Sequence, residues 1–317
     1  NDVTIGGESA GSFNTFALLL SPQAEGLFQK AALESGALTY VNANQMRLDK
    51  AIEIGKQVAA QFGADDSKEG LEILRKADPM DLWNVTALNI LNIMGGGQYT
   101  CYPVYDGAVL PLDSPLKAIE EGKFNKNVTI LMGNNRYEGL LFVHDGIAAE
   151  EDFNTFIKNA FREDSYQEVI DYYAAQTDRS FIDKANELNG MTIITLGVIA
   201  GEDAYEDAGA KLYVYEFNYT DSEGGMQTHA VEMPFVFGQD TLLSGDPMEG
   251  DDLLIRDATH AYWVNFIKTG NPNGGALMEW PEYVKDSQTI LEIDATPAQI
   301  NRSKQDVVDF LLPRYIR

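Results

Sequence analysis

The amino-terminal residues alternate between short apolar runs and an amphipathic stretch. Residues 3–5, Val-Thr-Ile, are followed by Gly6-Gly7, which predicts the end of a buried strand. Residues 28–33 form a second short apolar run, closed by Glu34-Ser35-Gly36, which predicts another buried strand. Between the two runs, apolar residues recur at the i, i+3, i+4, i+7 spacing of one helix face: Phe13, Phe16, Ala17 and Leu20.

The same patterns continue along the chain. An amphipathic helix is predicted over 48–62, a mostly helical segment over 150–209 with breaks near Thr177 and Asn189, and a further helix over 257–269. Apolar runs typical of buried strands occupy 127–133, 211–219 and 289–293. Strands that alternate with long helical segments predict a mainly parallel sheet with helices on both faces. We find no repeat and no linker that would divide the chain, so one α/β domain is expected.

Composition narrows the possible partners. The chain has 317 residues, with 23 Lys and Arg against 49 Asp and Glu, so its formal net charge is −26. Such a surface repels phosphate backbones and anionic membranes, and we expect neither as a partner. The longest apolar stretches, such as 17–20 and 310–312, are far too short to cross a bilayer. Cys101 is the only cysteine, which excludes an internal disulfide and favours a reducing, cytoplasmic compartment.

The strongest candidate chemistry lies in Gly7-Glu8-Ser9-Ala10-Gly11. A G-x-S-x-G pentapeptide that joins a strand to a helix forms a sharp turn, which exposes the serine hydroxyl. Here a predicted strand precedes the motif and a predicted helix follows it. The start of that helix directs N–H groups at the site, and the Ala10 N–H is expected to donate to an oxyanion. Ser9 is therefore the candidate nucleophile.

A serine hydroxyl needs a base, normally a histidine, and the chain has three. His260 lies within the predicted helix 257–269, where a packing or surface role is expected. His144 follows an apolar run and is interpreted as a lid or core residue. His229 lies in a glycine-containing loop after a predicted strand, and sites of this architecture lie in loops at the carboxyl ends of strands. We therefore predict that His229 is the base.

The acid that orients the base is harder to choose, because many acids lie between Ser9 and His229, as the chain order serine, acid, histidine requires. Glu138 is the preferred candidate because it lies just past the strand predicted at 127–133. Asp106 is the alternative, although its Asp-Gly sequence is typical of a turn.

These segments together resemble the type-B carboxylesterases, the family of para-nitrobenzyl esterases and cholinesterases. Residues 6–11 resemble the active-site signature of that family. The further matching blocks occur in the family's order: 26–28 with 34–36, 103–107, 133–139, His229 with Glu232 and 235–238, and 263–273. The resemblance implies an α/β-hydrolase fold and ester hydrolysis by Ser9, Glu138 and His229 through an acyl-serine, with no metal or cofactor. It also implies that Glu8, Ser35 and Glu232 support the triad.

Two features depart from the family pattern. The family's His-Gly-Gly oxyanion stretch should precede the nucleophile, but no histidine here is followed by Gly-Gly, and residues 95–97, a Gly-Gly-Gly run, come after Ser9. The family's first strands should also precede the nucleophile, which lies only eight positions after Asn1. We therefore expect 1–317 to be the carboxyl-terminal part of one α/β-hydrolase domain, with an exposed sheet edge that an amino-terminal segment or another copy covers.

Two other functions remain open at this point. The fold also includes cholinesterase-like interaction proteins that lack part of the triad, and a fragment of an esterase could itself be inert. This chain retains a serine, a glutamate and a histidine in the expected order. A serine esterase that acts on small-molecule esters is therefore the preferred interpretation.

Overall fold

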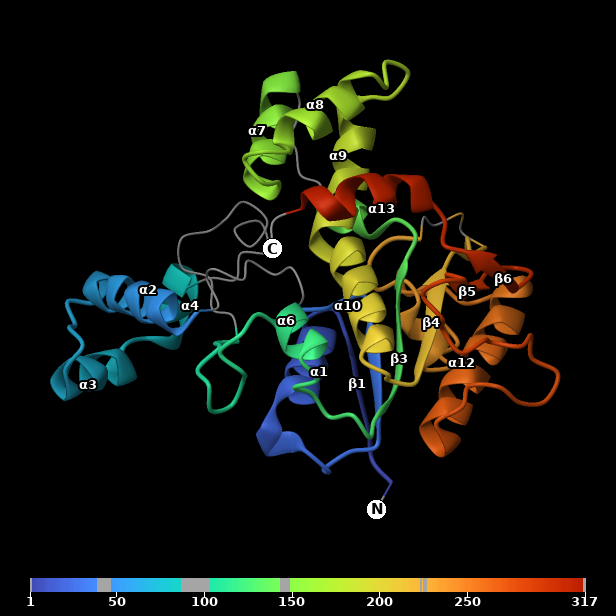
Figure 1. Cartoon of the computed structure of the whole chain (residues 1–317), viewed down its shortest axis with the longest axis horizontal. Helices are drawn as coiled ribbons and strands as arrows, with labels where there is room; N and C mark the ends of the chain where they lie inside the picture. The colour runs from blue at the N-terminus through green and yellow to red at the C-terminus, as the bar shows by residue number, and fades with distance from the viewer. Residues whose placement is uncertain are drawn as a thin grey trace. The chain divides into compact units, whose positions relative to one another are not determined.

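The computed structural model describes residues 2–38, 47–86, 103–142, 149–222, 224 and 227–315 (Figure 1). The chain divides into two compact units. The larger unit consists of Asn1–Val41 and Pro115–Arg317, and the smaller unit is Asn42–Ser114. The expectation of a single catalytic domain stays a prediction. His144, Cys101 and the glycine run 95–97 lie outside the described residues.

The larger unit is built on a six-stranded sheet whose spatial order follows the chain order. The strands are β1 (Thr4–Glu8), β2 (Lys30–Glu34), β3 (Thr129–Asn135), β4 (Leu212–Phe217), β5 (Thr289–Ile293) and β6 (Ala298–Asn301). β1 to β5 are parallel, and β6 runs antiparallel to β5. The predicted mainly parallel sheet is therefore confirmed, whereas β6 was not predicted. Among the described residues β1 pairs only with β2, and the expectation that something covers its outer edge stays a prediction.

Apolar side chains cover both faces of this sheet, because successive residues of a buried strand point to opposite faces. On one face, α12 (Asp251–Thr269) joins Tyr215, Trp263 and Trp280 in a core that includes residues of β2 to β5. On the other face lie α1 (Ala10–Leu20), α6 (Pro115–Glu120) and α10 (Leu196–Asp207). There the rings of Phe16 and Tyr205 lie 5.6 Å apart. The predicted two-faced helical cover is confirmed.

A second core joins several other helices of the larger unit to α10. It includes residues of α7 (Glu150–Ala160), α8 (Tyr166–Ala174), α9 (Phe181–Gly190) and α13 (Gln305–Leu311). The predicted break near Thr177 is present between α8 and α9. The break predicted near Asn189 is wrong, because α9 continues through a π-helical turn, Met191–Thr195, into α10. A π turn widens the helix without ending it, so the side-chain period changes although the chain stays helical.

Two other boundaries differ from the prediction. α12 begins at Asp251 rather than at Asp257; its first turn carries two acidic residues, which are favourable at the positive end of the helix dipole. α13 was not predicted as a helix. Most other elements differ by only a few residues, and no helix of the described chain is long and apolar enough to span a membrane.

The smaller unit contains α2 (Leu48–Gln61), α3 (Lys68–Lys76) and α4 (Pro79–Thr86). The Ser67 hydroxyl accepts a hydrogen bond from the Gly70 N–H at 3.0 Å and so caps α3. Arg47 and Tyr105 form an isolated parallel bridge. Next to this bridge, Asp106 accepts the backbone N–H groups of Ala108, Val109 and Leu110 at 2.9, 2.8 and 3.1 Å.

Candidate active site

Ser9 occupies a sharp turn between β1 and α1. Its φ of 54° and ψ of −116° are strained for a residue with a side chain. The turn requires glycine at two neighbours. A Cβ on Gly7 would lie 2.4 Å from the carbonyl carbon of Gly11, and a Cβ on Gly36 would lie 2.7 Å from the Ser9 carbonyl oxygen. The glycines therefore let the backbone fold closely enough to present Ser9.

The backbone around Ser9 is fixed by the adjacent strand. The Ser9 N–H donates to the Glu34 carbonyl oxygen at 2.8 Å, so it is already used in the sheet. Ala10, the first residue of α1, is exposed and follows Ser9 directly. The first N–H groups of a helix have no partner within the helix and carry partial positive charge. This is the geometry that an oxyanion donor at Ala10 requires.

His229 lies in the segment after β4 and has only 4% of its surface exposed. Its Nε2 is 2.7 Å from the Ser9 Oγ, and its Nδ1 is 2.6 Å from the Glu138 Oε2. The structure thus brings together the three residues expected from the sequence. His260 is placed differently: it lies in α12, with its Nδ1 2.8 Å from the Val236 carbonyl oxygen.

Glu138 is the first residue of a short 3₁₀ helix, η2 (Glu138–Phe142), that follows β3. It is 1% exposed, and its Oε1 accepts the Asn135 N–H at 2.6 Å. One oxygen of Glu138 is therefore held by the backbone while the other faces His229. The competing Asp106 belongs to the smaller unit, where its carboxylate is engaged with a turn. Glu138 is therefore the acid that contacts the His229 Nδ1.

The residues expected to support this group lie around it. Glu8 is the last residue of β1, and its Oε1 is 3.2 Å from the His229 Nε2. Glu232 is fully buried and accepts a hydrogen bond from the Ser35 hydroxyl at 3.4 Å. Ser35 has a positive φ of 52°, which places it in a tight turn after β2.

Burial and charge change the pKa values of this group. Burial favours the neutral imidazole, but the hydrogen bond and charge of Glu138, together with the charge of Glu8, outweigh it and raise the pKa of His229. Burial raises the pKa of Glu8 to about 7, although His229 opposes the rise. Burial also raises the pKa of Glu232 well above its usual value, with the Glu138 charge adding to the effect.

Two contributors were not identified from the sequence. The Asn135 side chain donates hydrogen bonds to Glu232 and, at 2.8 Å, to the Thr228 carbonyl oxygen, so it ties the end of β3 to the histidine segment. Glu34 is buried at the end of β2 and accepts the Trp263 Nε1–H at 3.1 Å; its burial raises its pKa to about 8. Each of these two residues is a polar residue at the carboxyl end of a buried strand, and that position in the sequence could have identified both.

The described residues contain no group of three or more His, Cys, Asp or Glu side chains arranged to hold a metal ion. The groups that meet at Ser9 are a hydroxyl, an imidazole and a carboxylate, connected in series by hydrogen bonds. Such a series activates a hydroxyl for attack on an acyl carbon.

Comparison with solved structures gives the same fold. A PNB esterase structure superposes with a TM-score of 0.79 and 25% sequence identity, covering 98% of this chain and 62% of that one. The α/β-hydrolase fold is therefore confirmed.

Among curated proteins, carboxylesterase 1E of Rattus norvegicus is 31% identical over 340 residues, covering 97% of this chain and 59% of the relative. Carboxylesterase 5A of Homo sapiens is 29% identical over 342 residues, covering 98% of this chain and 56% of the relative. The chain thus spans less than two thirds of the length of these relatives. The family described as "Carboxylesterase family" matches residues 1–311. With nearly its whole length matched, the chain belongs to the carboxylesterase family.

Proposed function

We propose that the protein hydrolyses carboxylic esters of small molecules through an acyl-serine intermediate formed on Ser9. The observation that carries this proposal is the pair of contacts at His229, 2.7 Å to the Ser9 Oγ and 2.6 Å to the Glu138 Oε2. Both distances are those of hydrogen bonds, and they link nucleophile, base and acid in the order that serine hydrolases use.

The proposed reaction has two halves. Ser9 Oγ attacks the ester carbonyl carbon while His229 Nε2 takes the hydroxyl proton, and the Ala10 N–H donates to the developing oxyanion. The tetrahedral intermediate collapses as His229 returns that proton to the leaving alcohol. Water then attacks the acyl-serine with His229 again as base, which releases the carboxylic acid and restores the Ser9 hydroxyl.

The carboxylates have different roles in this proposal. Glu138 accepts a hydrogen bond from the His229 Nδ1–H, fixes the imidazole tautomer and stabilises the imidazolium that forms after proton transfer. Glu8, 3.2 Å from Nε2, adds negative charge beside the imidazolium. Glu232 and Ser35 act at a distance: Glu232 bonds to Asn135, whose backbone N–H holds Glu138.

Labelling with a fluorophosphonate probe tests the proposal, because such a probe phosphonylates only an activated serine. We expect the wild-type chain to be labelled at Ser9 and to hydrolyse a short-chain aryl ester, and Ser9→Ala to lose both properties. Ser244→Ala, which removes an exposed serine in a turn, is the matched control and should keep both. Labelling at a serine other than Ser9, or full ester turnover by Ser9→Ala, would contradict the proposal.

A further inference from the structure

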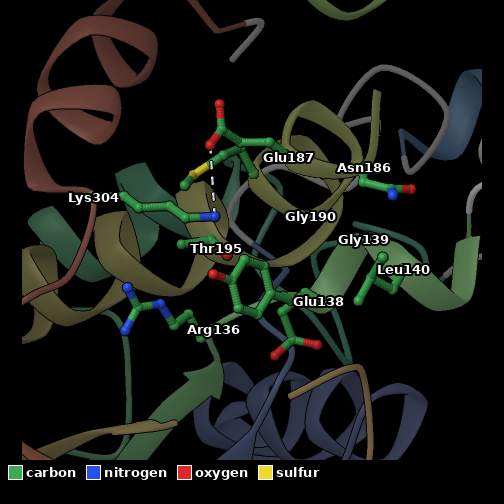
Figure 2. Close-up of a pocket in the computed structure, with 11 residues that line it drawn as sticks. Arg136, Glu138, Gly139, Leu140, Asn186, Glu187, Gly190, Thr195 and Lys304 are labelled. Atoms are coloured by element: carbon green, nitrogen blue, oxygen red, sulfur yellow. Dashed lines mark ion pairs between the residues drawn. The ribbon is translucent and has the colours of Figure 1, made fainter. Parts of the chain in front are cut away.

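The segment that carries Glu138 meets α9 at two glycines. Gly139 follows Glu138 in η2, and Gly190 is the last residue of α9. A Cβ built on Gly190 would lie 2.8 Å from the Gly139 nitrogen and 3.4 Å from the Glu138 Cβ. A Cβ built on Gly139 would lie 1.8 Å from the Asn186 carbonyl oxygen. The two backbones therefore touch without intervening side chains (Figure 2).

This junction fixes η2 from the side of the helices. The backbone is also fixed from the side of the sheet, where the Asn135 N–H binds the Glu138 carboxylate and the Tyr137 N–H donates to the Gln227 carbonyl oxygen at 2.9 Å. These hydrogen bonds orient the carboxylate and hold the segment on the sheet side. The direct backbone contact limits how closely η2 can approach α9, because closely packed atoms yield only a few tenths of an ångström.

The helix on the other side of the junction has an unusual form. Gly190 directly precedes the π turn Met191–Thr195, and η2 packs against both α9 and this turn. π turns within α-helices occur frequently at functional sites. Glu138, Gly139, Gly190 and Met191 also line one small cavity, shown in Figure 2. The end of α9 and the π turn therefore pack directly against η2, which carries Glu138.

We propose that Gly139 and Gly190 are positioning residues, whose direct backbone contact sets the distance between the Glu138 carboxylate and the His229 imidazole. The inference rests on the proposed function, because it assigns these glycines to the alignment of the acid and base. Neither glycine touches a reacting atom. A side chain at either position displaces η2 and lengthens the 2.6 Å contact between Glu138 and His229.

Gly190→Ala is the informative variant, because its added methyl requires only a small shift of η2. A misplacement of about 1 Å in an active site costs roughly 10²-fold in rate, so we expect a loss of about 10-fold in kcat. The KM should stay close to that of the wild type, because the substrate does not contact the junction. Gly139→Ala should be more damaging, because its methyl would clash with the main chain of α9.

A titration of His229 separates this role from a general loss of stability. His229 is faced by Glu138 of η2 and Glu8 of β1, and both carboxylates raise its pKa. If the junction holds Glu138 in place, NMR titration should give a lower His229 pKa in Gly190→Ala than in the wild type. His229→Ala assigns the resonance. An unchanged His229 pKa in folded Gly190→Ala would overturn the inference.

A double-mutant cycle provides an independent measurement. If Gly190 acts through Glu138, adding Gly190→Ala to Glu138→Gln should lower kcat no further, whereas independent effects would multiply. Gly55→Ala in α2 is the matched control, since nothing lies within 4 Å of a Cβ there, and it should leave kcat and the His229 pKa unchanged. Multiplicative losses in the cycle would contradict the proposed coupling.

Two further outcomes keep the inference and the proposed function distinguishable. If Gly190→Ala does not fold, Met191→Ala removes side-chain atoms from the cavity that Glu138, Gly139 and Gly190 also line, and it too should lower the His229 pKa; a wild-type value there would overturn the inference. If the wild-type chain shows no ester turnover, the proposed function fails, but the histidine titration still tests the junction, because it needs no activity.

Discussion

Two groups of buried and half-buried acids in the larger unit are compensated in different ways. The site carboxylates are Glu8, Glu34, Glu138 and Glu232; the arginine network consists of Arg302, Asn134, Glu202 and Glu216. In the arginine network, Arg302 donates to the Asn134 side chain at 2.9 Å and to Glu202 at 2.5 Å. Its charge also opposes the rise in the pKa of Glu216. Within the described chain, no arginine or lysine bonds to the site carboxylates, and the His229 imidazole lies 3.2 Å from Glu8 and 2.6 Å from Glu138.

The arginine network uses buried charge to stabilise the fold, whereas the site carboxylates place charge beside a group that exchanges protons. A permanent guanidinium holds the arginine network in one arrangement, because arginine does not lose its proton at ordinary pH. The site carboxylates instead surround a group that gains and loses a proton. The charges of Glu138 and Glu8 stabilise the imidazolium, whereas burial raises the pKa of Glu8, Glu34 and Glu232 and so favours their neutral form.

The largest effect is expected at the acid that contacts His229. Glu138→Gln keeps the shape of the side chain but removes the charge, so kcat for an aryl ester should fall by roughly 10⁴-fold. Asp106→Asn is the matched control, because Asp106 is engaged with a turn of the smaller unit, and kcat should stay near the wild-type value. Comparable losses in the two variants would show that Glu138 has no special role.

The arginine network should matter for stability instead. Arg302→Met leaves the fully buried Glu202 without its partner, and breaking a buried pair in this way costs about 3–5 kcal/mol. Urea unfolding measures the loss. Replacing both residues, with Glu202→Leu added to Arg302→Met, should recover most of it, because no buried charge remains. A double variant as unstable as Arg302→Met alone would contradict this account.

The unfolding free energy should decrease as pH rises, which is the opposite of the usual contribution of carboxyl groups. Burial raises the pKa of Glu34 to about 8 and of Glu202 to about 7, so the folded state keeps protons that the unfolded chain loses near its ordinary value. The unfolding free energy should therefore decrease as pH rises above 4.5, by about 1.4 kcal/mol per pH unit for each group; the contribution of Glu202 ends near pH 7 and that of Glu34 near pH 8.

Urea titrations at several pH values across this window provide the measurement. In Glu34→Gln the slope should be shallower, because that position no longer exchanges a proton on unfolding. An unfolding free energy that rises with pH through the window would show that these acids are ionised in the folded protein.

The smallest effect is expected at Glu8. Its charge helps to raise the pKa of His229, and catalysis needs the neutral imidazole, so kcat/KM should fall as pH drops through that raised value. Glu8→Gln should move this acid limb to lower pH. The exposed Glu25→Gln is the matched control and should leave the limb in place. A limb that does not move in Glu8→Gln would exclude an electrostatic role for this carboxylate.

The sequence by itself identified the elements with strong local patterns. Short apolar runs located β1 to β5, and the Gly-x-Ser-x-Gly motif between a strand and a helix located Ser9, because steric limits on the turn leave a local trace. The sequence also predicted that His229 lies in a loop after a strand. Local patterning did not reveal β6, α13 or the π turn. β6 has only partial burial along an edge, and a π turn keeps helical composition while shifting its period.

Only the tertiary structure decided which distant residues meet. Glu138 and Asp106 both follow chain order, and their separation into different units is a property of the folded backbone. The roles of Asn135 and Glu34, and the contact between Gly139 and Gly190, depend on segments far apart in the chain. Spacing along a sequence constrains neighbours on one helix or strand, whereas the packing of separate elements is set by side-chain volume and backbone approach, which no local pattern records.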